Sequence, residues 1–193
     1  MTQPTAAMLV VGDEILSGRT PDANAPHLAG VLAGTGIRLR EIRVVPDERE
    51  IIVEAVRTLS ARMDLVFTSG GIGPTHDDIT ADCVAEAMGA PIDVRADARA
   101  ILERHYGDEL NDARLRMARI PEGAELIENP LSQAPGFSLA NVHVMAGVPA
   151  IFREMLAGLR PRLRGGPPTL SHAFRVPRPE GDLADALRLA AAD

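Results

Sequence analysis

Lysine and tryptophan are absent from this sequence of 193 residues, and all 20 of its basic residues are arginine. Without lysine, the chain has no Schiff-base residue, no lysine general base and no phosphate-loop lysine. The single cysteine, Cys83, excludes an intrachain disulfide and a zinc site built on CxxC pairs. One tyrosine, four phenylalanines and a net charge of −7 leave little basis for binding a nucleic acid, so no such partner is predicted.

Long apolar stretches are also missing. The run from Ala6 to Val11 covers about six residues, against the ~20 needed to cross a bilayer, and the N-terminus lacks a signal-peptide pattern. With 46% hydrophobic and 24% charged residues, the composition is that of a globular protein. We predict a cytoplasmic protein with no membrane partner. It has one domain over residues 1–163 and a linker with a short C-terminal β-α extension over 164–193.

Strand and helix patterns alternate along the first part of the chain. Strands are predicted over 6–12, 37–45 and 63–71, the second of them nearer a sheet edge because its residues alternate between apolar and polar. Helices are predicted over 24–34 and from an Asp47–Glu50 capping box through Ser60. Such βαβ units with right-handed crossovers predict a doubly wound, mostly parallel α/β sheet.

The second half continues with shorter elements. Helices are predicted over 80–88, 96–105, 111–119 and 150–159. Short strands or hairpin arms are predicted over 91–94, 123–130, 135–140 and 142–147. After the linker of residues 164–168, residues 171–177 and 182–192 have the patterns of one strand and one helix.

The most informative segment is the loop of residues 68–80, which follows a central strand. Gly70, Gly71 and Gly73 allow a sharp turn that presents backbone N–H groups, and a helix N-terminus follows, so the loop suits a phosphate. Its sequence matches neither GxGxxG nor GxxxxGK[ST]. A second interpretation also remains open, in which the loop is an ordinary strand-to-helix turn capped by Asp78 or Thr80.

Two adjacent carboxylates, Asp77 and Asp78, follow the glycines. Beside a phosphate they would repel the ligand unless a divalent cation lay between them, which predicts Mg²⁺ or Co²⁺. Alternatively, one aspartate caps the helix and the other is solvated. His76 could donate a hydrogen bond to phosphate or simply be exposed.

Other strand-end loops extend this candidate site. Asp13 could help to hold the metal. An ordinary helix-capping role also fits Asp22, Asn24 and Asp47, as well as the start of the 80–88 helix. The Arg114, Arg116 and Arg119 run fits a solvated helix face, or one arginine could reach a ligand in a neighbouring subunit. Cys83 is interpreted as a small core residue. The candidate ligand-binding residues are Gly12, Asp13, Glu14, Ser17, Ser69, Gly70, Gly71, Gly73, Pro74, Thr75, Gly147, Val148 and Pro149.

Several segments taken in order resemble one family. GDEILSGRTPDANAPHLAGVLAGTGI, VVPDE, TSGGIGPTHDDIT, IPEGAELIENP, APGF and AGVP are similar to the molybdopterin-binding-like domain of CinA, MogA and MoaB proteins, and most similar to the CinA branch. The resemblance covers residues 6–160 and implies a three-layer α/β/α fold with a pocket for a pterin or nucleotide phosphate. Ser132 stands where CinA relatives usually have glycine, and Ala146 where they have proline.

The resemblance also implies three functions. The first is metal-dependent pyrophosphate cleavage of a nucleotide such as ADP-ribose, with Asp77 and Asp78 as the catalytic pair and, with Asp13, the metal ligands. The second is a molybdenum-cofactor protein that binds and adenylylates molybdopterin. The third is a catalytically silent binding or oligomerisation module. No deamidase activity is predicted. A homo-oligomer is expected, and the apolar residues of the tail are expected to pack on the core or on a second subunit.

Overall fold

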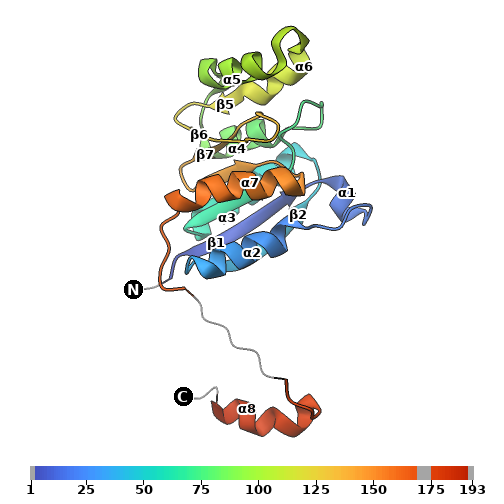
Figure 1. The fold of residues 1–193 in the computed structure, drawn as a ribbon, viewed down its shortest axis with the longest axis vertical. Helices are drawn as coiled ribbons and strands as arrows, with labels where there is room; N and C mark the ends of the chain where they lie inside the picture. Colours follow the sequence, from blue (N-terminus) through green and yellow to red (C-terminus); the bar gives the residue numbers. More distant parts are fainter. Residues whose placement is uncertain (1–2, 169–174, 191–193) are drawn as a thin grey trace.

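The structure, a computed structural model, describes residues 3–168 and 175–190 and is centred on a six-stranded sheet (Figure 1). Its strands are β1 (Thr5–Val11), β2 (Arg38–Val45), β3 (Leu65–Ser69), β6 (Glu125–Ile127), β7 (Gly136–Leu139) and β8 (Val142–Met145). The order is β2-β1-β3-β8-β7-β6. The pairs β2–β1, β1–β3 and β3–β8 are parallel, and β7 is antiparallel to both β8 and β6. The predicted mostly parallel α/β sheet is confirmed.

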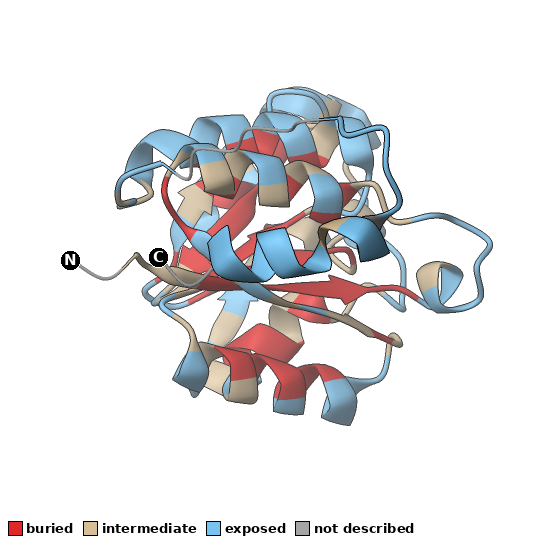
Figure 2. Cartoon of the chain, turned by 90° about the horizontal axis from the view of Figure 1, so that it is seen from below, coloured by how far each residue is buried: buried red, intermediate tan, exposed pale blue. Residues whose placement is uncertain are grey.

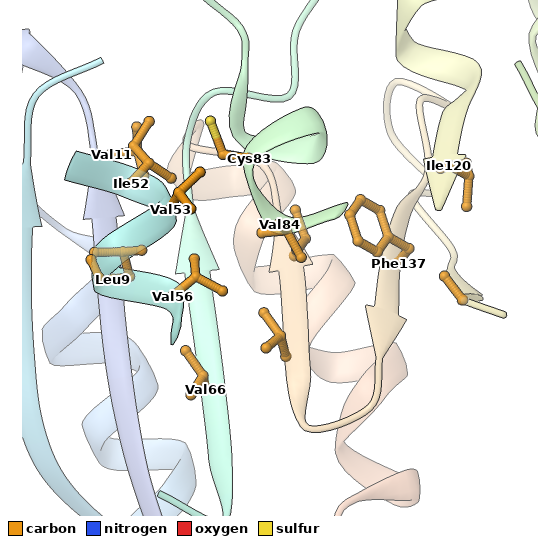
Figure 3. Close-up of a cluster of buried hydrophobic side chains, with 14 of the residues drawn as sticks. Leu9, Val11, Ile52, Val53, Val56, Val66, Cys83, Val84, Ile120 and Phe137 are labelled. Carbon is orange, nitrogen blue, oxygen red and sulfur yellow. The ribbon is translucent and has the colours of Figure 1, made fainter. Parts of the chain in front are cut away.

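Helices cover both faces of the sheet. The main ones are α2 (Asn24–Gly34), α3 (Arg49–Arg62), α4 (Thr80–Met88) and α7 (Pro149–Leu159). Side chains alternate along β1, so that Leu9 packs with α3 and α4 on one face while Met8 packs with α2 and α7 on the other. Figure 2 shows the buried layers on both sides of the sheet, and Figure 3 shows Leu9 with Val56 of α3 and Val84 of α4. The three-layer arrangement is therefore confirmed.

A smaller unit adjoins the β6 end of the sheet. It consists of α5 (Ala96–Tyr106), α6 (Asp112–Leu115) and an antiparallel pair of β4 (Ile92–Val94) and β5 (Arg119–Pro121). Short 3₁₀ turns at Gly107–Glu109 and Arg116–Ala118 join these elements. The remaining short helix, α1 (Asp13–Leu16), follows β1.

The helix predicted over 111–119 is wrong in its second half. Only α6 is α-helical, beginning after Asn111, whose Oδ1 accepts the Arg114 N–H at 2.9 Å. Pro121 disfavours helical backbone at Ile120, and the segment instead extends and pairs with β4. Arg119 also forms an ion pair with Asp82 of α4 at 2.5 Å, which holds the extended segment against α4.

The predicted capping box at the start of α3 is also wrong. The helix begins after Glu48, and no side chain caps it. Asp47 lies at the end of β2 beside the end of β1, and its Oδ2 accepts the Asp13 N–H at 3.0 Å. The prediction of β2 as an edge strand is confirmed.

The C-terminal tail is described over residues 175–190. Residues 171–174 of the predicted strand lie outside the described residues, while 175–177 form no strand. The predicted helix is present as α8 (Ala184–Ala190), which stands apart from the α/β body (Figure 1). Val176, Leu187 and Leu189 are exposed. The tail therefore does not pack on its own core over this range, and packing on a second subunit stays a prediction. None of the helices in the described ranges is long and apolar enough to span a bilayer.

Candidate functional site

A cavity of about 640 Å³ lies at the carboxyl ends of the parallel strands. The loops after β1, β3 and β8 meet there, as expected for ligand sites in open α/β sheets. The predicted site residues that line it are Gly12, Glu14, Gly70, Gly71, Gly73, Pro74, Asp77, Asp78, Gly147, Val148 and Pro149.

Four other predicted residues lie next to the cavity without lining it. Asp13 donates its N–H to Asp47, and the Ser17 hydroxyl donates to the Glu14 carbonyl at 3.3 Å. Ser69 is buried beneath the glycine loop, and Thr75 is bonded to Asp78. These residues support the walls of the cavity.

The glycine loop passes very close to β1. Gly70 has a φ of +106° and Gly71 a φ of +67°, and a Cβ on Gly70 would lie 2.2 Å from the Val11 carbonyl oxygen. Only glycine fits this approach. Within the described part of the chain, the N–H groups of Gly71, Ile72 and Gly73 have no hydrogen-bond acceptor, and all three residues line the cavity. Three consecutive free donors form a concavity suited to an anion.

The two aspartates that follow the glycines have different surroundings. Asp78 Oδ2 accepts the Thr75 N–H at 2.8 Å and the Thr75 hydroxyl at 2.5 Å, so this carboxylate closes the loop. Neither Asp78 nor Thr80 caps α4, which begins after Ile79 and whose Thr80 N–H donates to the Gly71 carbonyl at 2.9 Å. The Asp77 carboxylate is exposed. Its pKa is lowered mainly by the nearby Thr75 hydroxyl, and its own N–H helps.

Several carboxylates gather at the rim between the β1 and β3 loops. The pKa of Asp47 is raised, first by burial and then by the negative charges of Asp13, Glu14 and Asp77, against the lowering effect of the Asp13 N–H. Across the described ranges, however, no three His, Cys, Asp or Glu side chains are placed to hold one metal ion together. A cation at this rim would therefore be bound by one or two of these carboxylates together with oxygens of the bound ligand.

Asn24, at the start of α2, ties the loops together. Its buried Nδ2 donates to Ser69 Oγ at 2.8 Å and to the Gly147 carbonyl at 2.7 Å. Asp22 accepts the N–H groups of Asn24 and Ala25, as predicted for a helix-capping residue. The sequence could not assign the bridging role to Asn24, because its partners lie 45 and 123 positions away.

One part of the cavity wall comes from the smaller unit. Tyr106, Arg114 and Met117 line the cavity there, together with Ser132 from the loop before β7. Arg114 was expected on a solvated face or in a neighbour's site, and it instead reaches the cavity of its own chain. No local sequence pattern predicts this wall, since none of these residues follows a parallel strand.

The chain is similar to proteins of one family. The family described as "Probable molybdopterin binding domain" matches residues 7–165. A CinA-like protein of Citrifermentans bemidjiense is 41% identical over 157 residues, 78% of this chain and 38% of that relative. A CinA-like protein of Myxococcus xanthus is 34% identical over 96% of this chain and 47% of its own length. The chain thus spans less than half the length of these relatives.

Solved structures have the same fold. A CinA protein of unknown function from Thermoplasma acidophilum matches with a TM-score of 0.77 and 36% identity, over 82% of this chain and 98% of that chain. MoaB from Thermus thermophilus matches with a TM-score of 0.56 and 22% identity, over 83% of this chain and 91% of that chain, which shows the fold alone. From the match over most of its length and its CinA-like relatives, the chain belongs to the molybdopterin-binding-domain family, in its CinA-like branch.

Proposed function

We propose that this chain binds a phosphate-bearing nucleotide in the cavity and, with Mg²⁺ or Co²⁺, hydrolyses its pyrophosphate bond, with ADP-ribose as the representative substrate. The observation that carries the proposal is that Gly71, Ile72 and Gly73 line the cavity while their N–H groups have no acceptor in the described part of the chain. Backbone donors of this kind hold phosphate oxygens without a lysine. The chain contains no lysine.

The donor set at the rim fits a divalent cation that also contacts the ligand. Asp77 is exposed beside the glycine loop, and the pKa of Asp47 is raised by burial and, to a smaller extent, by the negative charges of Asp13, Glu14 and Asp77. When bound, the cation offsets the repulsion between carboxylate and phosphate and draws electron density from the phosphorus. Asp13 and Asp78 are less suited to direct contact, because Asp13 lies outside the cavity lining and Asp78 is bonded to Thr75.

The reaction adds one water across the P–O–P linkage. Its oxygen bonds to one phosphorus, the bridging oxygen leaves on the other phosphate, and ADP-ribose yields AMP and ribose 5-phosphate. The glycine-loop N–H groups stabilise the charge on the phosphate oxygens, and a rim carboxylate accepts the proton of the water. Asp47, Asp77 and Glu14 are candidates for this proton transfer, since all three line the cavity, whereas Asp78 accepts the Thr75 N–H and hydroxyl.

A substrate panel tests the activity. Incubation with ADP-ribose, NAD, FAD or ATP in Mg²⁺ or Co²⁺ is expected to release AMP from at least one of them, and chelator should abolish the release. Binding without product in every case would leave a silent binding module. Release of AMP that persists in chelator would contradict the role of the cation.

The two aspartates are expected to respond differently to substitution. Asp77→Asn should remove most of the dependence of ADP-ribose affinity on Mg²⁺ concentration, because the exposed carboxylate that contacts the cation is lost. Asp78→Asn should weaken binding with and without Mg²⁺, because it removes the charge that holds Thr75 and closes the loop. Titration calorimetry with and without chelator measures both. Equal Mg²⁺ dependence in wild type and Asp77→Asn would contradict this assignment.

The family description favours binding of molybdopterin as a second candidate function, and we propose adenylylation as the reaction that would accompany it. Molybdopterin also carries a phosphate, so the same glycine loop would hold it. Transfer of AMP from ATP to that phosphate would release pyrophosphate. Incubation with molybdopterin and ATP, followed by mass spectrometry for the AMP adduct, distinguishes this candidate from hydrolysis.

A further inference from the structure

The cavity lining combines two chemically different sets of residues. One set presents backbone N–H groups and carboxylates, from the glycine loop and the β1 loop. The other set consists of Tyr106, Arg114 and Met117 of the smaller unit, and Arg114 is the cationic side chain among the cavity-lining residues described. We propose that this second set, called here the ring wall, binds the planar heterocycle of the phosphate-bearing ligand by stacking. The inference rests on the proposed function and adds the group that the ring wall recognises.

Tyr106 and Arg114 form a pre-organised flat surface. The Arg114 guanidinium carbon lies 4.4 Å from the centre of the Tyr106 ring, and His105 packs edge-on against that ring at 4.6 Å. Arg114 Nη1 donates to the Glu109 carbonyl at 2.5 Å and lies 3.3 Å from the Glu109 carboxylate. These contacts fix the plane of the guanidinium before any ligand arrives. A fixed guanidinium and a phenol ring are groups on which aromatic heterocycles stack.

The surroundings of Arg114 favour a ring over a second anion. Its charge is partly balanced by the Glu109 carboxylate, and the same cavity is lined by Glu14, Asp47, Asp77 and Asp78. A second anionic group would therefore meet a weakened cation in a negative cavity. A flat ring stacked on the guanidinium would not meet that cost.

Ser132 adds a polar contact at the edge of the ring wall. The Asn129 side chain forms its hydrogen bonds within the loop. Its Nδ2 donates to Ser132 Oγ at 2.6 Å and to the Ala134 carbonyl at 2.9 Å. Its Oδ1 accepts the Ser132 N–H at 3.1 Å. The Ser132 hydroxyl hydrogen has no acceptor in the described ranges, and the residue lines the cavity. This hydrogen is available to a ring nitrogen or carbonyl. The expected ligand is thus a purine or pterin ring linked to phosphate.

The cavity is large enough for such a ligand. Its volume of about 640 Å³ lies within the range of roughly 300–1,000 Å³ that is typical of small-molecule sites. A cavity of this size can hold a heterocycle and a phosphate at the same time. A ligand that lacks the ring would bind through the glycine loop alone.

Calorimetry with two probes tests the ring wall. ADP carries the ring and two phosphates, whereas inorganic pyrophosphate carries only the phosphates, and both are titrated in Mg²⁺. Tyr106→Ala is expected to weaken ADP binding by about 10- to 100-fold and leave pyrophosphate binding unchanged. Tyr106→Phe, which keeps the aromatic ring, should bind both probes like the wild type. Thermal denaturation of each variant controls for folding.

Arg114 variants separate stacking from anion binding. Arg114→Lys keeps the charge and loses the plane, so it should weaken ADP binding as much as Arg114→Ala does. If Arg114→Lys restores ADP binding, or if Arg114→Ala also weakens pyrophosphate binding, Arg114 is an anion contact and the proposal is wrong. Equal losses for both probes in Tyr106→Ala would also contradict it, as would no loss for either probe.

Neopterin triphosphate is the third probe and identifies the ring. Tighter binding of ADP than of neopterin triphosphate would assign the wall to a purine, and the reverse order would assign it to a pterin. If the wild type binds pyrophosphate and binds neither ring-bearing probe more tightly than pyrophosphate, the proposed ring wall is wrong while the proposed phosphate site is supported. If the wild type binds none of the three probes, the proposed function fails as well.

Discussion

Gly70→Ala is expected to destabilise the fold by about 4 kcal/mol and to abolish ligand binding. The added Cβ would lie 2.2 Å from the Val11 carbonyl oxygen, at a backbone φ of +106° that alanine rarely adopts. Neither backbone segment can move away easily, since Val11 is the buried last residue of β1 and the Gly70 N–H donates to the Met145 carbonyl of β8. Urea denaturation and titration with ADP-ribose in Mg²⁺ measure the two effects.

Gly89→Ala is the matched control for this substitution. Gly89 ends α4 with a φ of +69°, and a Cβ there would have no atom within 4 Å. Gly89→Ala therefore tests the effect of a positive φ without the steric clash. We expect it to lower the free energy of unfolding by about 1 kcal/mol and to retain ligand binding. If Gly70→Ala costs no more than Gly89→Ala, the close approach of the glycine loop to β1 is not a constraint on the fold.

Acidification from pH 6.5 to pH 4 is expected to cost the fold up to about 3 kcal/mol through His143. Burial lowers the pKa of this histidine from 6.5 to about 4, and Arg162 contributes to the shift. The unfolded chain therefore takes up the proton first, and the folded state loses stability as pH falls through this range. His143 Nδ1 lies 2.8 Å from Ser138 Oγ, and Nε2 is buried without a partner in the described ranges, so a proton there would be poorly stabilised.

The pH dependence is measured by urea denaturation at intervals from pH 7 to pH 4. His143→Asn has no titrating group at this position, and it should flatten the curve whatever its stability at pH 7. The control is His76→Asn, which changes a side chain that is almost fully exposed and should keep the wild-type slope. Equal slopes in wild type and His143→Asn would show that the buried histidine does not govern acid stability.

The sequence was sufficient for the parts of the fold and site that follow from local pattern. The apolar run of β1, the alternation in β2 and the glycines after β3 are short-range signals, and each predicted both an element and its place in the sheet. Since parallel strands end at one edge, the loops after β1, β3 and β8 were expected to lie together. They line one cavity.

The remaining features depend on contacts between distant segments. Asp47 has the spacing of a helix cap, but the Asp13 N–H lies within its reach once β1 and β2 pair. Residues 116–119 have a helical pattern, but pairing of Arg119 with Val94 and the ion pair with Asp82 favour an extended end. Tyr106 and Arg114 come from a unit that follows no parallel strand, so no rule of strand ends could place them in the cavity.

The central claim is that the free N–H groups of the glycine loop hold the phosphate of a ligand. Amide NMR during titration with ADP-ribose and Mg²⁺ tests it most directly. The signals of Gly71, Ile72 and Gly73 should shift and saturate together, while those of Gly89 and Gly158, at open positions, stay in place. Saturable shifts elsewhere with these three amides unmoved, or no shift at all, would contradict the claim.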